Sequence, residues 1–191
     1  MTDNAAGGWL TAPPPDRPAD INTSAAHPAR VYDYWLGGKD NFAADREVGD
    51  WVLAATPGLR ERVLANREFL VRAVRYLATE AGIRQFLDIG TGLPSANNTH
   101  EVAQEAAPNS RIVYVDNDPL VLAHARALLA GGPAGSVQFV DADVRDVESI
   151  VRAASRTLDL TRPTAHTWRP GPDDIVPPGG VSAYGGAARK A

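Results

Sequence analysis

An acid and two glycines near residue 88 form the part of the sequence best suited to binding chemistry. The segment reads Phe86-Leu-Asp-Ile-Gly-Thr-Gly-Leu-Pro94, with Asp88 two residues ahead of a Gly-x-Gly turn. The apolar residues before the turn indicate a buried parallel strand, and glycines let the backbone approach a ligand closely. A helix that follows the turn could point its N-terminus at the same place. The pattern predicts a pocket for a nucleotide-like cofactor.

The residues of this turn separate two classes of cofactor. The dinucleotide fingerprint needs a third glycine, and Ser95 stands at that position here. The Asp88 carboxylate would repel a pyrophosphate, but it would pair with the ammonium group of S-adenosylmethionine. The turn therefore favours a sulfonium cofactor over a dinucleotide. An ordinary strand-to-helix turn with a solvated acid is the alternative.

A second apolar run, Arg111-Ile-Val-Tyr-Val-Asp116, ends in an acid 28 residues after Asp88. A Rossmann-like unit places a carboxylate at about this spacing, where it accepts hydrogen bonds from ribose hydroxyls. We therefore expect Asp116 to bind a ribose. The alternative is an acid that merely ends a strand or a turn.

A third run, Ser136-Val-Gln-Phe-Val-Asp-Ala-Asp143, ends in two acids. Open α/β sheets bind ligands at the carboxyl ends of their strands, so Asp143 could accept a hydrogen bond from an adenine amine. Alternatively, Asp141 or Asp146 is a turn residue or the cap of the following helix.

The segments between these runs have helical periodicity. Asp118 followed by Pro119 and an apolar stretch to Leu129 predicts one helix. Apolar residues at steps of three, four and six predict a helix of roughly 20 residues that begins near Leu59. Shorter helices are expected at residues 99–107 and 146–156. The predicted order is a helix followed by β-α-β-α-β-α, which is an α/β fold.

Several motifs in order make the chain resemble the class I S-adenosylmethionine-dependent methyltransferases. It is more closely similar to a bacterial subfamily long catalogued only as a domain of unknown function, from about His27 to about Pro163. Pro94 in the turn also looks like that subfamily. The matching segments are Pro28 to Arg46, Asn66 to Arg75, the turn after Asp88, Tyr114 to Pro119 and Val140 to Asp146.

The resemblance implies a Rossmann-like fold with a site for S-adenosylmethionine, covered by a lid segment formed by residues 27–82. It implies Asp88, Gly90 and Gly92 at the methionine part of the cofactor, Asp116 at the ribose, and Asn117, Asp143 and Val144 around the adenine.

Aromatic and basic residues of the lid segment offer further ligand contacts. Tyr32, Tyr34 and Trp35 have aromatic faces that could attract a sulfonium. Arg30 or Lys39 could meet the cofactor carboxylate. The alternative, given equal weight, is that the aromatic rings pack the lid segment onto the domain.

Methyl transfer depends strongly on placing donor and acceptor together, which can lower the activation barrier by about 7–11 kcal/mol. A dedicated base is therefore not assigned, and the catalytic residue is unknown. His100 is the histidine to test as a base, although a lone histidine near a helix start is more often solvated or capping. The methyl acceptor is unknown.

Composition excludes several other functions. The 191 residues include no cysteine, which excludes disulfides, thiolate metal sites and a cysteine nucleophile. A net charge of −4 gives no basic footprint for nucleic acid, and no apolar run approaches the length of a membrane span. We expect a cytoplasmic protein with a small-molecule cofactor and no metal.

The two ends of the chain are expected to be disordered. Residues 1–26 form a proline-rich leader, and residues 164–191 form a tail rich in proline and glycine. The domain at residues 83–163 then has three parallel strands, which makes the class I fold incomplete. We hypothesise a truncated or frame-shifted chain, testable by translating the encoding DNA in the other frames. The first strand would keep an open edge, through which the chain could self-associate.

Three functions remain open at this point. The acids and glycines predict an S-adenosylmethionine-dependent methyltransferase that acts on an unknown acceptor. The missing strands favour a catalytically inactive remnant that binds the cofactor. An NAD-dependent oxidoreductase comes third, because it shares the ribose-binding acid but requires a glycine at the position of Ser95.

Overall fold

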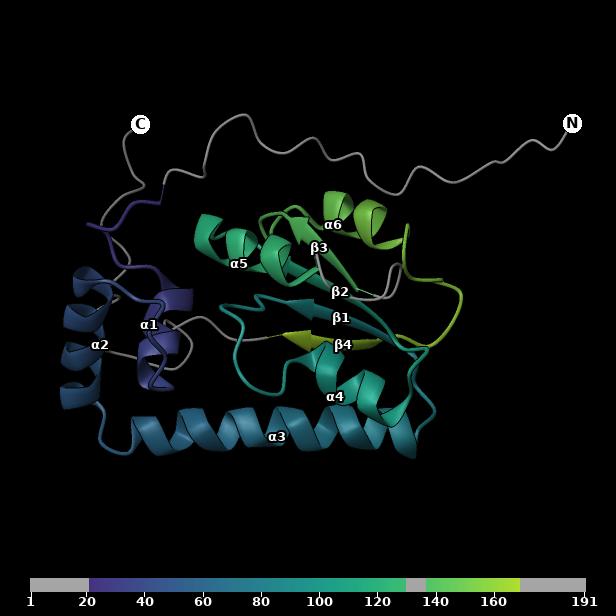
Figure 1. Ribbon diagram of the computed structural model, residues 1–191, viewed down its shortest axis with the longest axis horizontal. Helices are drawn as coiled ribbons and strands as arrows, with labels where there is room; N and C mark the ends of the chain where they lie inside the picture. The colour runs from purple at the N-terminus through teal and green to yellow at the C-terminus, as the bar shows by residue number, and fades with distance from the viewer. Residues whose placement is uncertain (1–20, 130–136, 169–191) are drawn as a thin grey trace, which may run out of the picture.

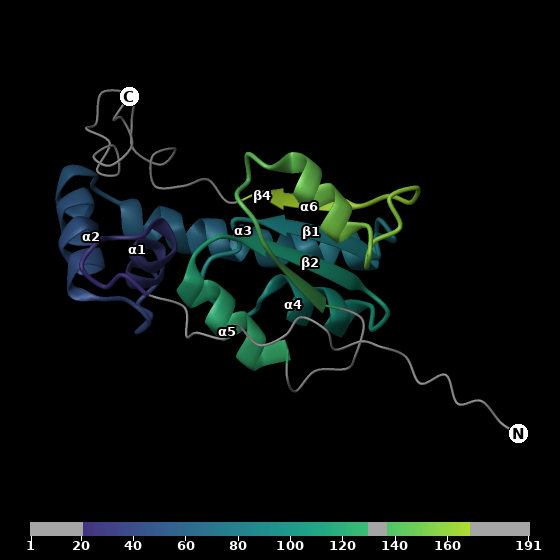
Figure 2. The same cartoon turned by 90° about the horizontal axis from the view of Figure 1, so that it is seen from above.

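The computed structural model describes residues 21–129 and 137–168, which fold around one parallel sheet with helices on both faces (Figure 1). Seen from above, the strands lie in the order β3-β2-β1-β4 (Figure 2). Because every strand pair is parallel, the carboxyl ends of the strands meet at one edge of the sheet. The strands are β1 (Gln85–Ile89), β2 (Arg111–Asp116), β3 (Val137–Asp141) and β4 (Ala165–Trp168).

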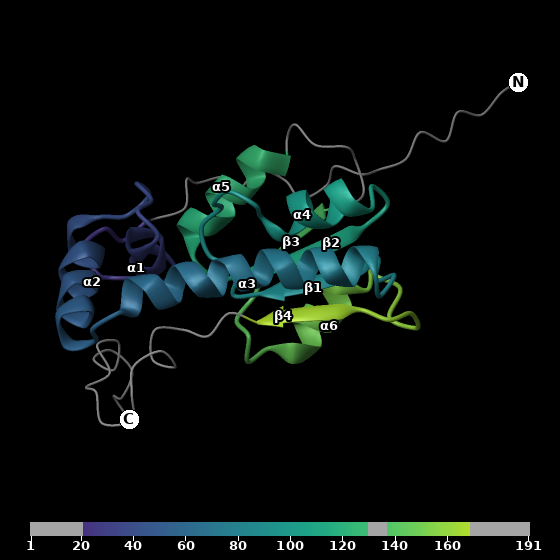
Figure 3. The same ribbon diagram turned by 90° about the horizontal axis from the view of Figure 1, so that it is seen from below.

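The helices lie on opposite faces of this sheet. Two of them, α3 and α4, run beneath the sheet (Figure 3), whereas α6 covers the upper face. None of the helices in residues 21–129 and 137–168 is long and apolar enough to cross a membrane. The helices are α1 (Pro28–Trp35), α2 (Ala43–Ala55), α3 (Leu59–Thr79), α4 (Thr99–Ala106), α5 (Pro119–Leu129) and α6 (Val147–Ala154).

Alternation along the strands divides the core between the two faces. Phe86 of β1 points into a lower cluster that includes Val74 of α3. The next residue, Leu87, points into an upper cluster that includes Ile150 of α6. Successive side chains of a strand point to opposite faces, and a parallel sheet is apolar on both. This explains why β1 and β2 carry apolar residues on both faces.

The helices α1 and α2 pack with the start of α3 around a separate core, which is formed by the apolar side chains of Val31, Trp35, Val52 and Val63. The second half of α3 belongs to the lower core of the sheet. One long helix, α3, therefore joins α1 and α2 to the sheet and contributes to both cores (Figure 1).

Local signals in the sequence predict the helix starts well. Asp118 Oδ1 accepts the N–H of Leu120 at 2.8 Å, directly before Pro119 begins α5. Asp146 Oδ1 accepts the N–H of Ser149 at 3.1 Å and caps α6. The helices predicted from Leu59, over residues 99–107 and over 146–156 are confirmed as α3, α4 and α6.

A fourth strand corrects the prediction of three strands and of a tail that begins at residue 164. The strand β4 pairs in parallel with β1, from Phe86 opposite Ala165 to Ile89 opposite Trp168. Strand pairing uses backbone N–H and C=O groups, so four residues without an apolar run can pair. The open edge predicted for the first strand is wrong, because β4 covers it.

The side chain of Gln85 holds the connection that leads into β4. Its Oε1 accepts the N–H of Asp159 at 2.6 Å, and its Nε2 donates to Asp159 O at 3.0 Å and to Thr164 Oγ1 at 3.3 Å. These bonds bring the chain back beside the start of β1. Residues 169–191 of the predicted tail and 1–20 of the predicted leader lie outside the described residues.

Candidate functional site

The turn after β1 is folded tightly against the end of β2. Gly90 has φ 67° and Gly92 has φ 66°, in the left-handed region where a residue with a Cβ atom costs roughly 1–2 kcal/mol. The N–H groups of Gly90 and Thr91 donate to Val115 O at 2.9 and 3.3 Å. The two glycines predicted from the sequence are thus required by the backbone conformation of the turn.

The Asp116 carboxylate links this turn to the loop that follows β2. Its Oδ2 accepts the N–H of Gly92 at 2.8 Å. Its Oδ1 accepts the N–H groups of Asn117 and Asp118 at 2.9 and 3.0 Å. A carboxylate has about four lone-pair sites, and three of them are used. About one acceptor site remains for a ligand hydroxyl.

The hydrogen bonds of the turn test which cofactor could fit there. A pyrophosphate needs backbone N–H groups, but those of Gly90, Thr91 and Gly92 already have partners. Ser95 N–H donates to Asn98 Oδ1 at 3.1 Å, and Pro94 has no N–H. The donor groups of these five residues do not suit a phosphate. A nearly buried carboxylate beside side-chain-free glycines suits a cofactor that presents hydroxyls and a positive charge.

Asp88 lies under the sheet, on the side of α4. Its side chain is 2% exposed, and Oδ2 accepts a hydrogen bond from Thr99 Oγ1 at 2.7 Å. The acid is therefore built into the contact between β1 and α4. Contact between Asp88 and a cofactor ammonium stays a prediction.

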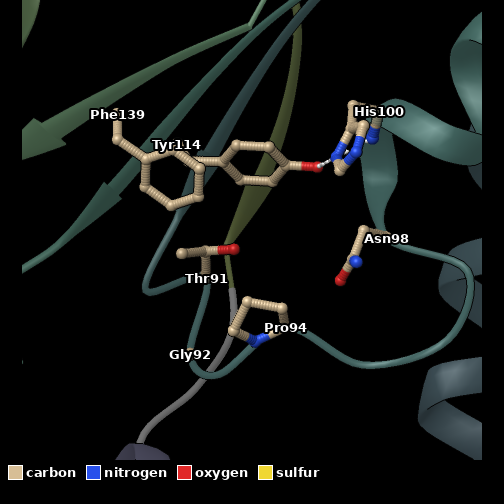
Figure 4. Close-up of a pocket in the computed structure, with 7 residues that line it drawn as sticks. All are labelled: Thr91, Gly92, Pro94, Asn98, His100, Tyr114 and Phe139. Atoms are coloured by element: carbon tan, nitrogen blue, oxygen red, sulfur yellow. Dashed lines mark hydrogen bonds between the residues drawn. The ribbon is translucent and has the colours of Figure 1, made fainter. Parts of the chain in front are cut away.

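A small hollow lies between the glycine turn and the lower face of the sheet (Figure 4). Its empty volume is about 220 Å³, part of which is open to solvent. Tyr114 and Phe139 form one wall, with ring centroids 4.7 Å apart in a stacked arrangement. The lining residues are Thr91, Gly92, Pro94, Asn98, His100, Tyr114 and Phe139.

His100 and Tyr114 interact at the back of this hollow. The backbone N–H of His100 donates to the Tyr114 hydroxyl at 2.7 Å, and His100 Nδ1 lies 2.9 Å from the same oxygen (Figure 4). Burial raises the pKa of Tyr114, with a further contribution from the nearby Asp88 charge. Burial lowers the pKa of His100, against the opposing effect of Glu101. The tyrosine thus keeps its proton, and Nδ1 of a neutral imidazole can accept it in a hydrogen bond.

The loop after β3 brings two of the predicted adenine residues, Asp143 and Val144, to the same edge of the sheet as Asp116. Ala142 N–H donates to Asp116 O at 3.2 Å, and Asp143 is the next residue along the chain. The Asp143 carboxylate accepts the N–H and Nε–H of Arg145, and this pairing lowers the pKa of Asp143. Val144 is 50% exposed, and Asn117 is exposed. Adenine contacts for these three residues stay a prediction.

Arg30 and Tyr34 are engaged within the N-terminal part of the chain. Tyr34 donates its hydroxyl to Asp50 Oδ1 at 2.6 Å. Arg30 donates to Asn22 O and Ala25 O, both at 3.0 Å, and is buried. Contact of either residue with a cofactor stays a prediction. Residues 22 and 25, which the sequence assigned to the disordered leader, are here held by Arg30.

Sequence reasoning missed a buried group of charges beside the site. His27 Nδ1 lies 2.8 Å from Asp118 Oδ2, and Arg30 Nε lies 3.6 Å from the same oxygen. Arg30 Nε is also 3.5 Å from Asp45 Oδ1. The sequence marked Asp118 as a helix cap only. The partners are separated by up to roughly 90 residues, so no local spacing rule could have paired them.

Comparison with known proteins adds an independent line of evidence. A family model described as S-adenosyl methyltransferase matches residues 15–169. A candidate methyltransferase from Thermobifida fusca YX, whose crystal structure is known, is 51% identical with a TM-score of 0.74, over 82% of this chain and 57% of its own. A DUF574 family protein from Streptomyces avermitilis MA-4680 is 54% identical with a TM-score of 0.71, over 75% of this chain and 56% of its own.

No curated protein matches the chain. The chain spans somewhat more than half the length of each of the two solved structures. The matched region contains the glycine turn, the Asp116 loop and all four strands of the described sheet. The four-stranded parallel sheet agrees with the fold of those structures. The chain belongs to the S-adenosyl methyltransferase family.

Proposed function

We propose that this chain binds S-adenosylmethionine at the carboxyl edge of β1, β2 and β3 and serves in methyl transfer to an unknown acceptor. The observation that carries the proposal is the Asp116 carboxylate, which is joined to Gly92 and to the loop after β2 with an acceptor site to spare. Membership of the S-adenosyl methyltransferase family supports the identity of the cofactor.

The residues of the chain would bind and orient the cofactor, and the cofactor would supply the methyl group. Gly90 and Gly92 leave room for the methionine part next to the turn, because neither has a side chain. Asp116 would accept a hydrogen bond from a ribose hydroxyl. The loop at residues 142–144 would meet the adenine. These groups would fix the position of the donor, and positioning can supply a large part of the rate of methyl transfer.

The test is a calorimetric titration of the 191-residue chain with S-adenosylmethionine, repeated with Asp116→Ala. A hydrogen bond to a charged group contributes about 1.5–3 kcal/mol, so we expect the substitution to weaken binding by about 10- to 100-fold. The matched control is Asp159→Ala. Asp159 also accepts a backbone N–H, from Thr161, but it lies beside Gln85 at the start of β1.

Binding of S-adenosylmethionine that Asp116→Ala weakens and Asp159→Ala leaves unchanged would support the site. A folded wild-type chain that shows no saturable binding would contradict the proposal. A parallel titration with NAD addresses the oxidoreductase alternative, for which the turn lacks free N–H donors at residues 90–92.

The second candidate is a module that binds the cofactor without transferring its methyl group. The observation in its favour is coverage, because the chain spans 57% and 56% of the two solved structures. Release of S-adenosylhomocysteine in the presence of a panel of acceptors would distinguish the two functions. Turnover supports the transferase, and saturable binding with no turnover on any acceptor supports the module.

A further inference from the structure

Four side chains from three parts of the chain form the buried charge cluster, defined as His27, Arg30, Asp45 and Asp118. Arg30 and Asp45 belong to α1 and α2, His27 caps α1, and Asp118 precedes α5. The side chains of Arg30, Asp45 and Asp118 are 5%, 0% and 2% exposed, and that of His27, at the rim of the cluster, is 30% exposed. Asp45 Oδ1 also accepts the N–H of His27 at 2.8 Å. The cluster ties the N-terminal helices to the loop after β2.

Within this cluster, His27 Nδ1 lies near one group that donates a hydrogen bond and one that accepts a hydrogen bond. The N–H of Ala29 points at Nδ1 from 3.3 Å, as expected for a helix cap. The Asp118 carboxylate oxygen lies closer, at 2.8 Å, and a carboxylate only accepts hydrogen bonds. With a proton on Nδ1 the imidazole donates to this carboxylate, and without one it accepts the N–H of Ala29, so the two contacts are alternatives. The side chain of His27 thus does more than cap α1.

Asp118 links the side chain of His27 to Asp116 in the candidate site. Its N–H donates to Asp116 Oδ1 at 3.0 Å, and its Oδ1 caps α5 through Leu120. Its remaining oxygen, Oδ2, is the one that faces His27 and Arg30. The three contacts fix the position of residues 116–118, which include the acid assigned to the ribose.

We propose that His27 and Arg30 are positioning residues, which act through Asp118 to hold Asp116 in its binding conformation. This inference rests on the proposed function. Docking of α1 and affinity for the cofactor are then coupled, and the coupling is reciprocal, because any ligand that favours the ordered loop also favours the docked helix.

The experiment compares His27→Asn with His27→Asp in the full chain. Asparagine and aspartate are close in shape and are both good N-caps, so the start of α1 is preserved in each variant. The asparagine amide can donate to Asp118, whereas an aspartate would repel it. We expect His27→Asn to bind S-adenosylmethionine nearly as the wild type does, and His27→Asp to bind about tenfold more weakly.

Adding Asp118→Asn to His27→Asp removes the repulsion and should restore most of the lost affinity. The matched control is Asp50→Ala, which removes the partner of Tyr34 on α2 and leaves the charge cluster intact. Thermal unfolding of each variant without cofactor shows whether it is folded.

Equal affinities for His27→Asn and His27→Asp, with a binding wild type, would show that residue 27 only caps the helix and would overturn the inference. Failure of the double variant to recover affinity would also count against it. A wild-type chain that does not bind the cofactor overturns the proposed function itself, and the positioning role with it. The two failures are therefore distinguishable.

Discussion

Tyr114 shows how a single hydroxyl joins the sheet to the helix that follows the glycine turn. It accepts the backbone N–H of His100 at the start of α4 while its ring stacks on Phe139. Removing one partner of a buried hydrogen bond leaves the other unsatisfied, and this costs more than the bond itself contributes. A residue inside an apolar strand thus controls the position of α4.

At the residue scale, we expect Tyr114→Phe to lower the free energy of unfolding by about 1–2 kcal/mol, because the His100 N–H loses its acceptor. Urea denaturation monitored by circular dichroism measures the change. The control is Tyr76→Phe, since Tyr76 is 61% exposed on α3 and its change should fall within about 0.5 kcal/mol. Equal effects at the two positions would show that the hydroxyl of Tyr114 has no structural role.

At the element scale, the position of β4 depends on Gln85 rather than on apolar burial. We expect Gln85→Leu to destabilise the fold by about 1–3 kcal/mol, because both backbone groups of Asp159 lose their partner. Amide hydrogen exchange in residues 165–168 should become faster than in the wild type. The control is Gln104→Leu, where one bond to Ser110 O is lost. Unchanged exchange in β4 would contradict this role of Gln85.

Also at the element scale, α6 and β4 leave apolar residues exposed on the upper face of the sheet. Ile150 of α6 is buried, but Val147 and Val151 are 62% and 44% exposed, and Trp168 of β4 is 62% exposed. Val147 and Val151 follow the same helical spacing as the buried residues Ile150 and Ala154, yet they do not pack into the core of the sheet. Periodicity predicts a helix correctly, but it does not say how wide the covered face is.

At the scale of the whole molecule, stability should fall as the solution becomes more acid, in two steps. Burial lowers the folded-state pKa of His100 below the ordinary 6.5. The unfolded chain then takes up a proton near pH 6.5 before the folded chain does, so the contribution of His100 is lost as pH falls through its folded pKa.

The second step concerns Asp118. Burial alone would raise its pKa, but the hydrogen bond and charge of His27 lower it overall, below the ordinary 3.8. The contribution of Asp118 to the free energy of unfolding is present above about pH 4 and is lost as pH falls through its lowered folded-state pKa. Asp33, whose pKa burial raises, acts in the opposite direction and reduces the net slope.

Thermal unfolding from about pH 8 to about pH 3 checks both steps. The variant His100→Asn keeps an acceptor near Tyr114 but does not titrate, so it should lose the first step and keep the second. A melting temperature that is constant or rises as pH falls would contradict both assignments.

The described sheet also decides where self-association could occur. With β4 in place, the edges of the described sheet are β3 and β4, and β1 lies inside. Because β4 pairs with β1, self-association cannot use the edge of the first strand, and self-association itself stays a prediction. Any pairing of sheets between copies, measurable by sedimentation, would have to use β3 or β4.

Much of the fold was predictable because its signals are local. The glycine turn, the runs that end at Ile89 and Asp116, and the Asp118–Pro119 start of α5 each depend on residues close in sequence. Strand β4 was missed because its four residues carry no apolar run, and its place depends on Gln85, roughly 80 residues away. The carboxylates beside Arg30 could not be predicted either, since a cation in a motif does not reveal which acids surround it.

The sequence by itself determined the elements from α3 to α6, their order, and the edge of the sheet where acids and glycines meet, since these follow from periodicity, capping and the parallel arrangement of strands. Tertiary structure alone decided which side chains face the site and which hold the fold together. It turned Asp88 towards Thr99, placed Asp116 on Gly92, and brought His27 and Arg30 to Asp118. The physical reason is that the hydrogen bonds and charge pairs of buried groups are satisfied across distant parts of the chain.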